Sequence, residues 1–122
     1  MTTIVLWADK FDETADFYRL LLNARFENRS EGFVSIISDS HEILLHRVPT
    51  EWASDISVPP LVREENRLKP CFQVSSIADA RESVAATNGC VLDADREQSH
   101  GSKTYCDGHD PEGNVIQVYS VN

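Results

Sequence analysis

The sequence YCDGHDPEGNVIQVY, residues 105–119, decides the fold of this chain. It predicts a strand, a tight turn and a last strand. Pro111 presets φ for the first central position of the turn, and Gly113 supplies the positive φ that a closing residue needs. The Asp110 side chain can accept hydrogen bonds from the backbone that follows it. The stretch is therefore predicted to be the closing hairpin of the chain.

The last strand alternates between two faces, and Gln117 lies on one of them, between Val115 and Tyr119. If that face lines a cavity, Gln117 is a candidate to contact a ligand. If the face meets water, Gln117 only keeps the strand soluble, which is the more common arrangement in antiparallel sheets.

The length and charge of the chain limit its class. Its 122 residues fit a single domain, and a hydrophobic content of 41% is ordinary for a globular protein. The formal net charge of -9 disfavours partners that require a basic face. We therefore expect no binding to nucleic acid and none to anionic membranes.

The cysteines and the first residues bear on location. Cys71, Cys90 and Cys106 are odd in number and include no Cys-x-x-Cys pair, which indicates reduced thiols rather than a disulfide framework or a zinc site. No charged lead with a long apolar run opens the chain, and no later run reaches membrane-spanning length. The sequence therefore predicts a cytoplasmic protein without a signal peptide or a transmembrane helix.

The first half of the chain predicts a strand, an amphipathic helix with Asp12 as its N-cap, and three further strands. These elements are expected at residues 4–8, 13–24, 26–30, 33–37 and 42–48. The second half repeats this order, with a capping box at Ser76 opening its helix. Shifting one half onto the other places Leu6 on Phe72 and Tyr18 on Val84, which indicates an internal duplication.

Each half is thus predicted to be a β-α-β-β-β module. The modules occupy about residues 1–49 and 68–122 of one domain, 1–122, and the connector at 50–67 is a loop or one short helix. Because each helix covers one face of its sheet, the other face is free to enclose a cavity, where small ligands bind.

Three further stretches carry a family resemblance. They are Asp9 with FYRLLLN at 17–23, KPCFQV at 69–74, and DGHDPEGNVIQ at 107–117. With these residues the chain resembles the vicinal oxygen chelate superfamily, which includes glyoxalase I, extradiol dioxygenases and the fosfomycin- and bleomycin-resistance proteins. The resemblance covers nearly the whole chain. It implies an α+β, glyoxalase-like fold in which two βαβββ modules form a half-open mixed β-barrel with the helices outside.

Members of this superfamily that hold a metal use four positions on the cavity strands. The resemblance places them at Thr2, at Leu45 (or at His46 with the register shifted by one residue), at Lys69 and at Gln117. A catalytic metal site needs three protein ligands, and at most two candidates remain here. We therefore predict no metal and no cofactor, and we assign no catalytic residue.

Cys71 is the best-placed thiol, because it lies on a predicted cavity strand beside Lys69, whose charge would lower the thiol pKa. The alternative is a purely structural role, in which Cys71 is a small, unreactive apolar residue, as cysteines on buried strands usually are.

The favoured interpretation is a metal-independent binder of small molecules, akin to the drug-sequestering branch of the superfamily and, by the same resemblance, a homodimer. The expected pocket residues all lie on or beside cavity strands: Thr2, Ile4, Leu45, His46, Lys69, Cys71, Tyr105, Gln117 and Tyr119. One alternative is a metal-dependent lyase, isomerase or dioxygenase that uses His46 and Gln117 in a site completed across a dimer. Another is a structural or regulatory module with a protein partner, which a large exposed apolar patch would indicate.

Overall fold

The computed structural model describes every residue from Met1 to Asn122. The first half contains β1 (Thr2–Ala8), α1 (Phe11–Leu21), β2 (Arg25–Glu27), β3 (Phe33–Ile37) and β4 (His41–Arg47). The connector carries one 3-10 turn, η1 (Thr50–Trp52). The second half contains β5 (Cys71–Gln73), α2 (Ile77–Ser83), β6 (Cys90–Val91), η2 (Ala94–Arg96), β7 (Gln98–His100), β8 (Lys103–His109) and β9 (Val115–Val121).

The two halves have the same sheet topology. The strand order is β1-β4-β3-β2 in the first sheet and β5-β9-β8-β6 in the second, where β7 adds to β8. In each sheet the first strand of the half runs parallel to the last, and the remaining pairs are antiparallel. No strand of one sheet pairs with a strand of the other, so no barrel closes. The predicted α+β fold of two mixed sheets with helices on one side is confirmed.

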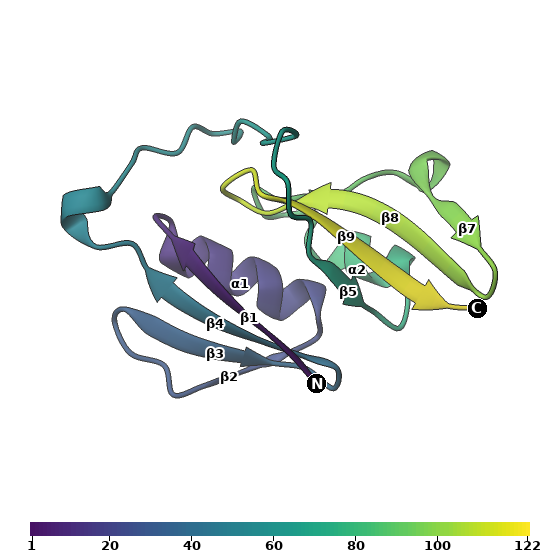
Figure 1. The fold of residues 1–122 in the computed structure, drawn as a ribbon, viewed down its shortest axis with the longest axis horizontal. Helices are drawn as coiled ribbons and strands as arrows, with labels where there is room; N and C mark the ends of the chain where they lie inside the picture. Colours follow the sequence, from purple (N-terminus) through teal and green to yellow (C-terminus); the bar gives the residue numbers. More distant parts are fainter.

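Both helices lie on the same side of the two sheets, behind them in Figure 1. The strand residues that face the helices are buried, for example Ile43 and Leu45 in β4 and Val118 in β9. Together with the inner faces of α1 and α2 they form one core cluster of 20 buried residues that draws on both halves. Each sheet therefore keeps one face without a covering helix, and we call these the first and the second open face.

The closing turn has the predicted geometry. Gly113 has φ of 86°, and the Asp110 side chain accepts hydrogen bonds from the backbone N–H groups of Glu112 (2.9 Å) and Asn114 (3.0 Å). The connector lies against this turn, because the Arg63 N–H donates to the Gly113 carbonyl at 2.8 Å. The turn thus holds both the last hairpin and the segment between the halves.

The start of α1 differs from the prediction. The helix begins at Phe11 after Lys10, so Asp12 is not its N-cap but lies in its first turn and pairs with Arg29 at 3.0 Å. The backbone N–H of Lys10 instead donates to the carboxylate of Glu112 at 2.6 Å. The cap comes from a residue 102 positions away, which a local pattern does not reveal.

The second helix begins as predicted: the Ser76 hydroxyl accepts a hydrogen bond from the Asp79 N–H at 3.1 Å. Neither helix is both long enough and apolar enough to cross a membrane.

Candidate functional site

The first open face is apolar and aromatic at one end. Strand pairing places Trp7 of β1 beside His46 of β4, and Phe33 of β3 on the other side of His46. The Trp7 and His46 rings stack with centroids 4.5 Å apart, and Phe33 lies 5.0 Å from His46. At the other end, Thr3 donates to Glu42 at 3.2 Å.

The second open face gathers five of the nine predicted site residues. Alternation along β5, β8 and β9 turns Phe72, Cys106 and Val118 into the core. Their neighbours in each strand therefore point away from α2. The predicted residues brought together on this face are Lys69, Cys71, Tyr105, Gln117 and Tyr119.

Asp107 connects the polar members of this group. The Lys69 ammonium donates to its two carboxylate oxygens at 3.1 and 3.2 Å, and the Gln117 amide donates to one of them at 3.0 Å. The Gln117 carbonyl oxygen in turn accepts from the Cys71 thiol at 3.4 Å. One carboxylate thus orients both the cation and the amide on which the predicted site was centred.

Asp107 was not among the predicted site residues: the sequence predicts the strand before the closing turn at residues 103–106, whereas β8 continues to His109. Had the strand been extended, alternation would have placed Asp107 on the same face as Tyr105.

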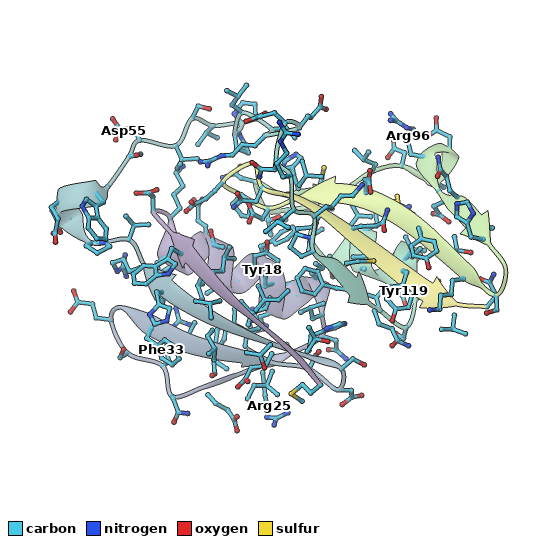
Figure 2. All side chains as sticks on the ribbon, viewed as in Figure 1. Tyr18, Arg25, Phe33, Asp55, Arg96 and Tyr119 are labelled. Carbon is cyan, nitrogen blue, oxygen red and sulfur yellow. The ribbon has the colours of Figure 1, made fainter.

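Two aromatic residues, Tyr105 on β8 and Tyr119 on β9, form one end of the second open face, and Figure 2 shows Tyr119 toward the C-terminal end of β9. Tyr105 and Tyr119 are directly paired, with ring centroids 5.7 Å apart. The Tyr119 hydroxyl donates to the Gln73 side chain at 3.3 Å, and the Lys103 ammonium lies 5.0 Å from the Tyr119 ring centroid. These rings offer flat apolar contact area next to the Asp107 network.

Two adjoining cavities lie at the second half. The larger one, of about 480 Å³, is lined by Val62, Glu64, Asn66, Arg67, Leu68, Lys69, Leu92, Arg96, Asp107, Gly108, His109 and Val115. A smaller one of about 160 Å³ reaches Tyr105 and Gln117. Lys69, Leu92, Arg96 and Asp107 line both, so the two spaces share one wall. The connector contributes a side of the larger cavity.

Four predicted residues lie elsewhere. Leu45 is fully buried, and Ile4 packs against the same core, so neither lines an open cavity. Thr2 is on the same side of β1 as Ile4, at the exposed end of the strand. His46 lies on the first open face. Because Leu45 is in the core, the side chain that faces outward at this point of β4 is that of His46 and not that of Leu45. Leu45 and His46 lie on opposite faces of β4 because successive side chains of a strand alternate between its two faces.

The Cys71 thiol is not activated. Desolvation raises its pKa, and the opposing effect of Lys69 is the smaller one, since Lys69 is engaged by Asp107. Lys69 does lower this pKa, as expected, but burial outweighs its effect, so the net shift is upward and the thiol stays protonated at neutral pH. The pKa values of Cys90 and Cys106 are also raised by burial. All three cysteines are free thiols.

The residues of one chain do not fit a metal centre. No three His, Cys, Asp or Glu side chains converge anywhere in the chain. Of the four positions named above, Lys69 is an ion-paired cation and Leu45 is in the core, while His46 and Gln117 lie on different sheets. We derive no chemical step through a metal.

No protein-family model and no curated protein matches the sequence. Solved structures do match. A glyoxalase/bleomycin resistance protein from Albidiferax ferrireducens has a TM-score of 0.70 and 10% identity, over 100% of this chain and 98% of that one. An integron cassette protein from V. cholerae has a TM-score of 0.66 and 21% identity, over 100% of this chain and 94% of that one.

A genomically encoded fosfomycin resistance protein from Listeria monocytogenes has a TM-score of 0.66 and 12% identity, over 100% of this chain and 93% of that one. At such identities the likeness concerns the fold and not the activity. The chain therefore has the fold of the glyoxalase and bleomycin-resistance proteins, that of the vicinal oxygen chelate superfamily.

Proposed function

We propose that this protein binds a small organic molecule, without a metal, at the second open face and the cavities beside it. The observation that carries the proposal is the convergence of Lys69, Gln117 and Cys71 around one carboxylate, Asp107, next to about 480 Å³ of space. Few, oriented polar groups beside apolar walls are typical of small-molecule sites, and the volume is in their usual range.

Binding is favoured over catalysis by the state of the reactive groups. The Cys71 thiol has a raised pKa and no histidine among its hydrogen-bond partners, so it lacks the base that activates a nucleophile. Lys69 is ion-paired with Asp107 at 3.1 Å and supplies a positive charge to the site. What remains is an arrangement that recognises shape and polarity.

A thermal-shift screen against metabolites and antibiotics tests this proposal, since a ligand of the folded form raises the melting temperature. For any hit, Gln117→Ala is expected to weaken binding roughly tenfold, because it removes one oriented hydrogen-bonding group. His46→Ala, a change on the first open face, is the matched control and is expected to leave affinity unchanged. A hit weakened only by His46→Ala would contradict the proposed location.

We propose further that the protein is a homodimer, in which a second copy covers the apolar end of the first open face. Val5 and Trp7 of β1 are 57% and 50% exposed, and exposed large apolar side chains that lie together mark interaction surfaces. Sedimentation at micromolar concentration is expected to give twice the chain mass, and Trp7→Ser is expected to yield monomers. A monomeric native protein would end this proposal.

The placement of His46 and Gln117 supports a second candidate function. They lie on the open faces of different sheets, so only a partner chain could bring such residues into one site. In that case the protein would be a metal-dependent lyase, isomerase or dioxygenase. Stoichiometric retention of nickel or zinc by the native protein and its loss in His46→Ala would favour this function over simple binding.

We also propose a cytoplasmic location, supported by the three free thiols, which persist in reducing compartments. Cell fractionation tests it.

A further inference from the structure

We infer that the larger cavity selects small organic anions, namely an apolar body carrying one carboxylate or phosphoryl group. This inference rests on the proposed binding function and names the ligand class of the same site. The charge of the residues that line the cavity supports it. The cavity is lined by three cations, Arg67, Lys69 and Arg96, and by two carboxylates, Glu64 and Asp107, a balance of +1 in a chain of net charge -9.

The two arginines of the cavity have no acidic partner. Lys69 is neutralised by Asp107, but neither Arg67 nor Arg96 makes a salt bridge or a side-chain hydrogen bond. Five other arginines of the chain are engaged by a carboxylate, a carbonyl or an aromatic ring: Arg19, Arg25, Arg29, Arg47 and Arg81. Arg63 is the remaining unengaged arginine, and it lines a different cavity. Two of the three free guanidinium groups therefore meet at one site.

A guanidinium presents its N–H donors in a planar fork that matches carboxylate and phosphate oxygens. The cavity adds apolar surface from Val62, Leu68, Leu92 and Val115. His109 lines it as well, and its Nδ1 donates to the Asp110 carbonyl at 2.9 Å, so Nε2 is the ring nitrogen left for a ligand. An anion with an apolar body meets all of these groups.

The elements that bring the free arginines have no counterpart in the first half. Arg96 closes η2, which with β7 is inserted between β6 and β8, while β2 and β3 are joined by a short loop. Figure 2 shows Arg96 at this inserted segment, beyond β8. Arg67 belongs to the connector. The elements that the two halves share supply the sheets, whereas the connector and the inserted segment η2–β7 supply Arg67 and Arg96.

Titration calorimetry at constant ionic strength tests the inference with four probes of similar size. Benzoate and phenyl phosphate carry the two anionic groups, benzyl alcohol is neutral and benzylamine is cationic. We expect at least one anion to bind at least tenfold more tightly than the alcohol, and the amine to bind most weakly. The ratio between benzoate and phenyl phosphate distinguishes a carboxylate site from a phosphoryl site.

Arg67→Met and Arg96→Met are each expected to weaken binding of the preferred anion roughly tenfold to hundredfold, the range for a charge-assisted hydrogen bond. Arg63→Met removes the same charge from the same connector, but Arg63 lines another cavity, so without direct contact to the ligand the change is expected to leave the affinity within about twofold. Equal losses in all three variants would show a general charge effect and overturn the inference.

The two proposals fail in different ways. A neutral or cationic ligand that binds in a Gln117-dependent manner, with Arg67→Met and Arg96→Met silent, overturns the anion selectivity and leaves the binding function standing. If neither the four probes nor the thermal-shift panel yields any ligand, the proposed binding function itself is overturned, and the anion selectivity with it.

Discussion

Glu112 is a carboxylate that the fold keeps almost entirely from water, with 4% exposure. It accepts the Lys10 N–H at the start of α1, so it satisfies one of the backbone donors that a helix N-terminus leaves free. Burial raises its pKa, although the bond from Lys10 acts in the opposite direction, and Asp110 and Asp9 add repulsion. Glu112 therefore stabilises the start of α1 as a hydrogen-bond acceptor, while burial disfavours its charged form.

We expect Glu112→Gln to be at least as stable as the native protein at pH 7, since glutamine keeps an acceptor oxygen and removes the buried charge. Because the folded pKa is raised, the contribution of Glu112 to stability is fully present below the unfolded pKa and is lost as pH rises through the folded pKa. Glu112→Ala is expected to cost about 1–3 kcal/mol, since it orphans the Lys10 N–H. Urea unfolding measures both, and a Gln variant as weak as the Ala variant would refute this account.

His41 is a buried histidine that the fold holds neutral. Its Nε2 accepts the backbone N–H of Gln73 at 2.8 Å, so the ring proton is on Nδ1, which has no partner. Its pKa is lowered, chiefly by burial and also by the charge of the N-terminal amine. The bond joins β4 to β5 and therefore links the two halves.

Acidification is expected to weaken this link. A lowered folded pKa means that the contribution of His41 to stability is complete above the unfolded pKa, about 6.5, and is lost as pH falls through the folded value. Between pH 7.5 and 5.5 the free energy of unfolding should therefore fall more in the native protein than in His41→Gln. Parallel pH profiles for the two proteins would contradict this.

At the scale of the elements, the closing turn depends on one glycine. Gly113 combines a positive φ with a close approach of the connector: a Cβ there would overlap the Leu61 carbonyl. Gly101 also has a positive φ, of 60°, but has open space where its Cβ would be. The chain thus provides its own matched control for the effect of the approach.

We expect Gly101→Ala to cost about 1–2 kcal/mol, the strain of a left-handed residue with a Cβ. Gly113→Ala should cost more, because either the turn or residues 61–63 must move as well. Chemical unfolding measures the difference, and faster proteolysis within the connector in Gly113→Ala alone would locate the displacement. Equal costs at the two positions would show that the contact with Leu61 does not matter.

At the scale of the whole molecule, one buried hydrogen bond ties the halves together. The Tyr18 hydroxyl in α1 donates to the Asp110 carboxylate in the closing turn at 2.8 Å, across 92 positions of sequence. Burial, and next the Asp110 charge, raise the pKa of Tyr18 well above its usual value, so the hydroxyl stays a donor at neutral pH. The Asp110 carboxylate also accepts the backbone N–H groups of the closing turn, so it is hydrogen-bonded to both α1 and the last hairpin.

Tyr18→Phe is expected to lower the free energy of unfolding by about 1.5–3 kcal/mol, the range for a hydrogen bond to a charged group. Tyr105→Phe, whose hydroxyl makes no hydrogen bond, is the control and should change stability by less than about 0.5 kcal/mol. Thermal melts should stay a single transition, because one core spans both halves. Matching losses in the two variants would remove the special role of Tyr18.

The two halves share a sheet topology but differ in the side chains on their open faces. Cys71 and Gln117 are paired in the second sheet at the place where Val5 and Leu44 are paired in the first. One open face is therefore polar around Asp107, and the other is apolar beside Trp7. We propose the polar face for the ligand and the apolar face for a second copy on the basis of this difference.

The order of the elements, the closing turn and the alternation of side chains along each strand could be read from the sequence alone. These features depend on local physics: positive φ at Gly113, side-chain acceptors at Asp110 and Ser76, and a period of two along strands. Alternation alone does not say which strands lie side by side, and strand pairing brings Lys69, Cys71, Tyr105, Gln117 and Tyr119 to one face.

Only the tertiary structure decided which faces are open, that Leu45 is under α1, that Glu112 rather than Asp12 serves the start of α1, and that Asp107 holds Lys69. It also decided that Arg67 and Arg96 line one cavity. Each of these depends on residues tens of positions apart, whose approach is set by sheet register and by packing of one half on the other. No local pattern contains that information.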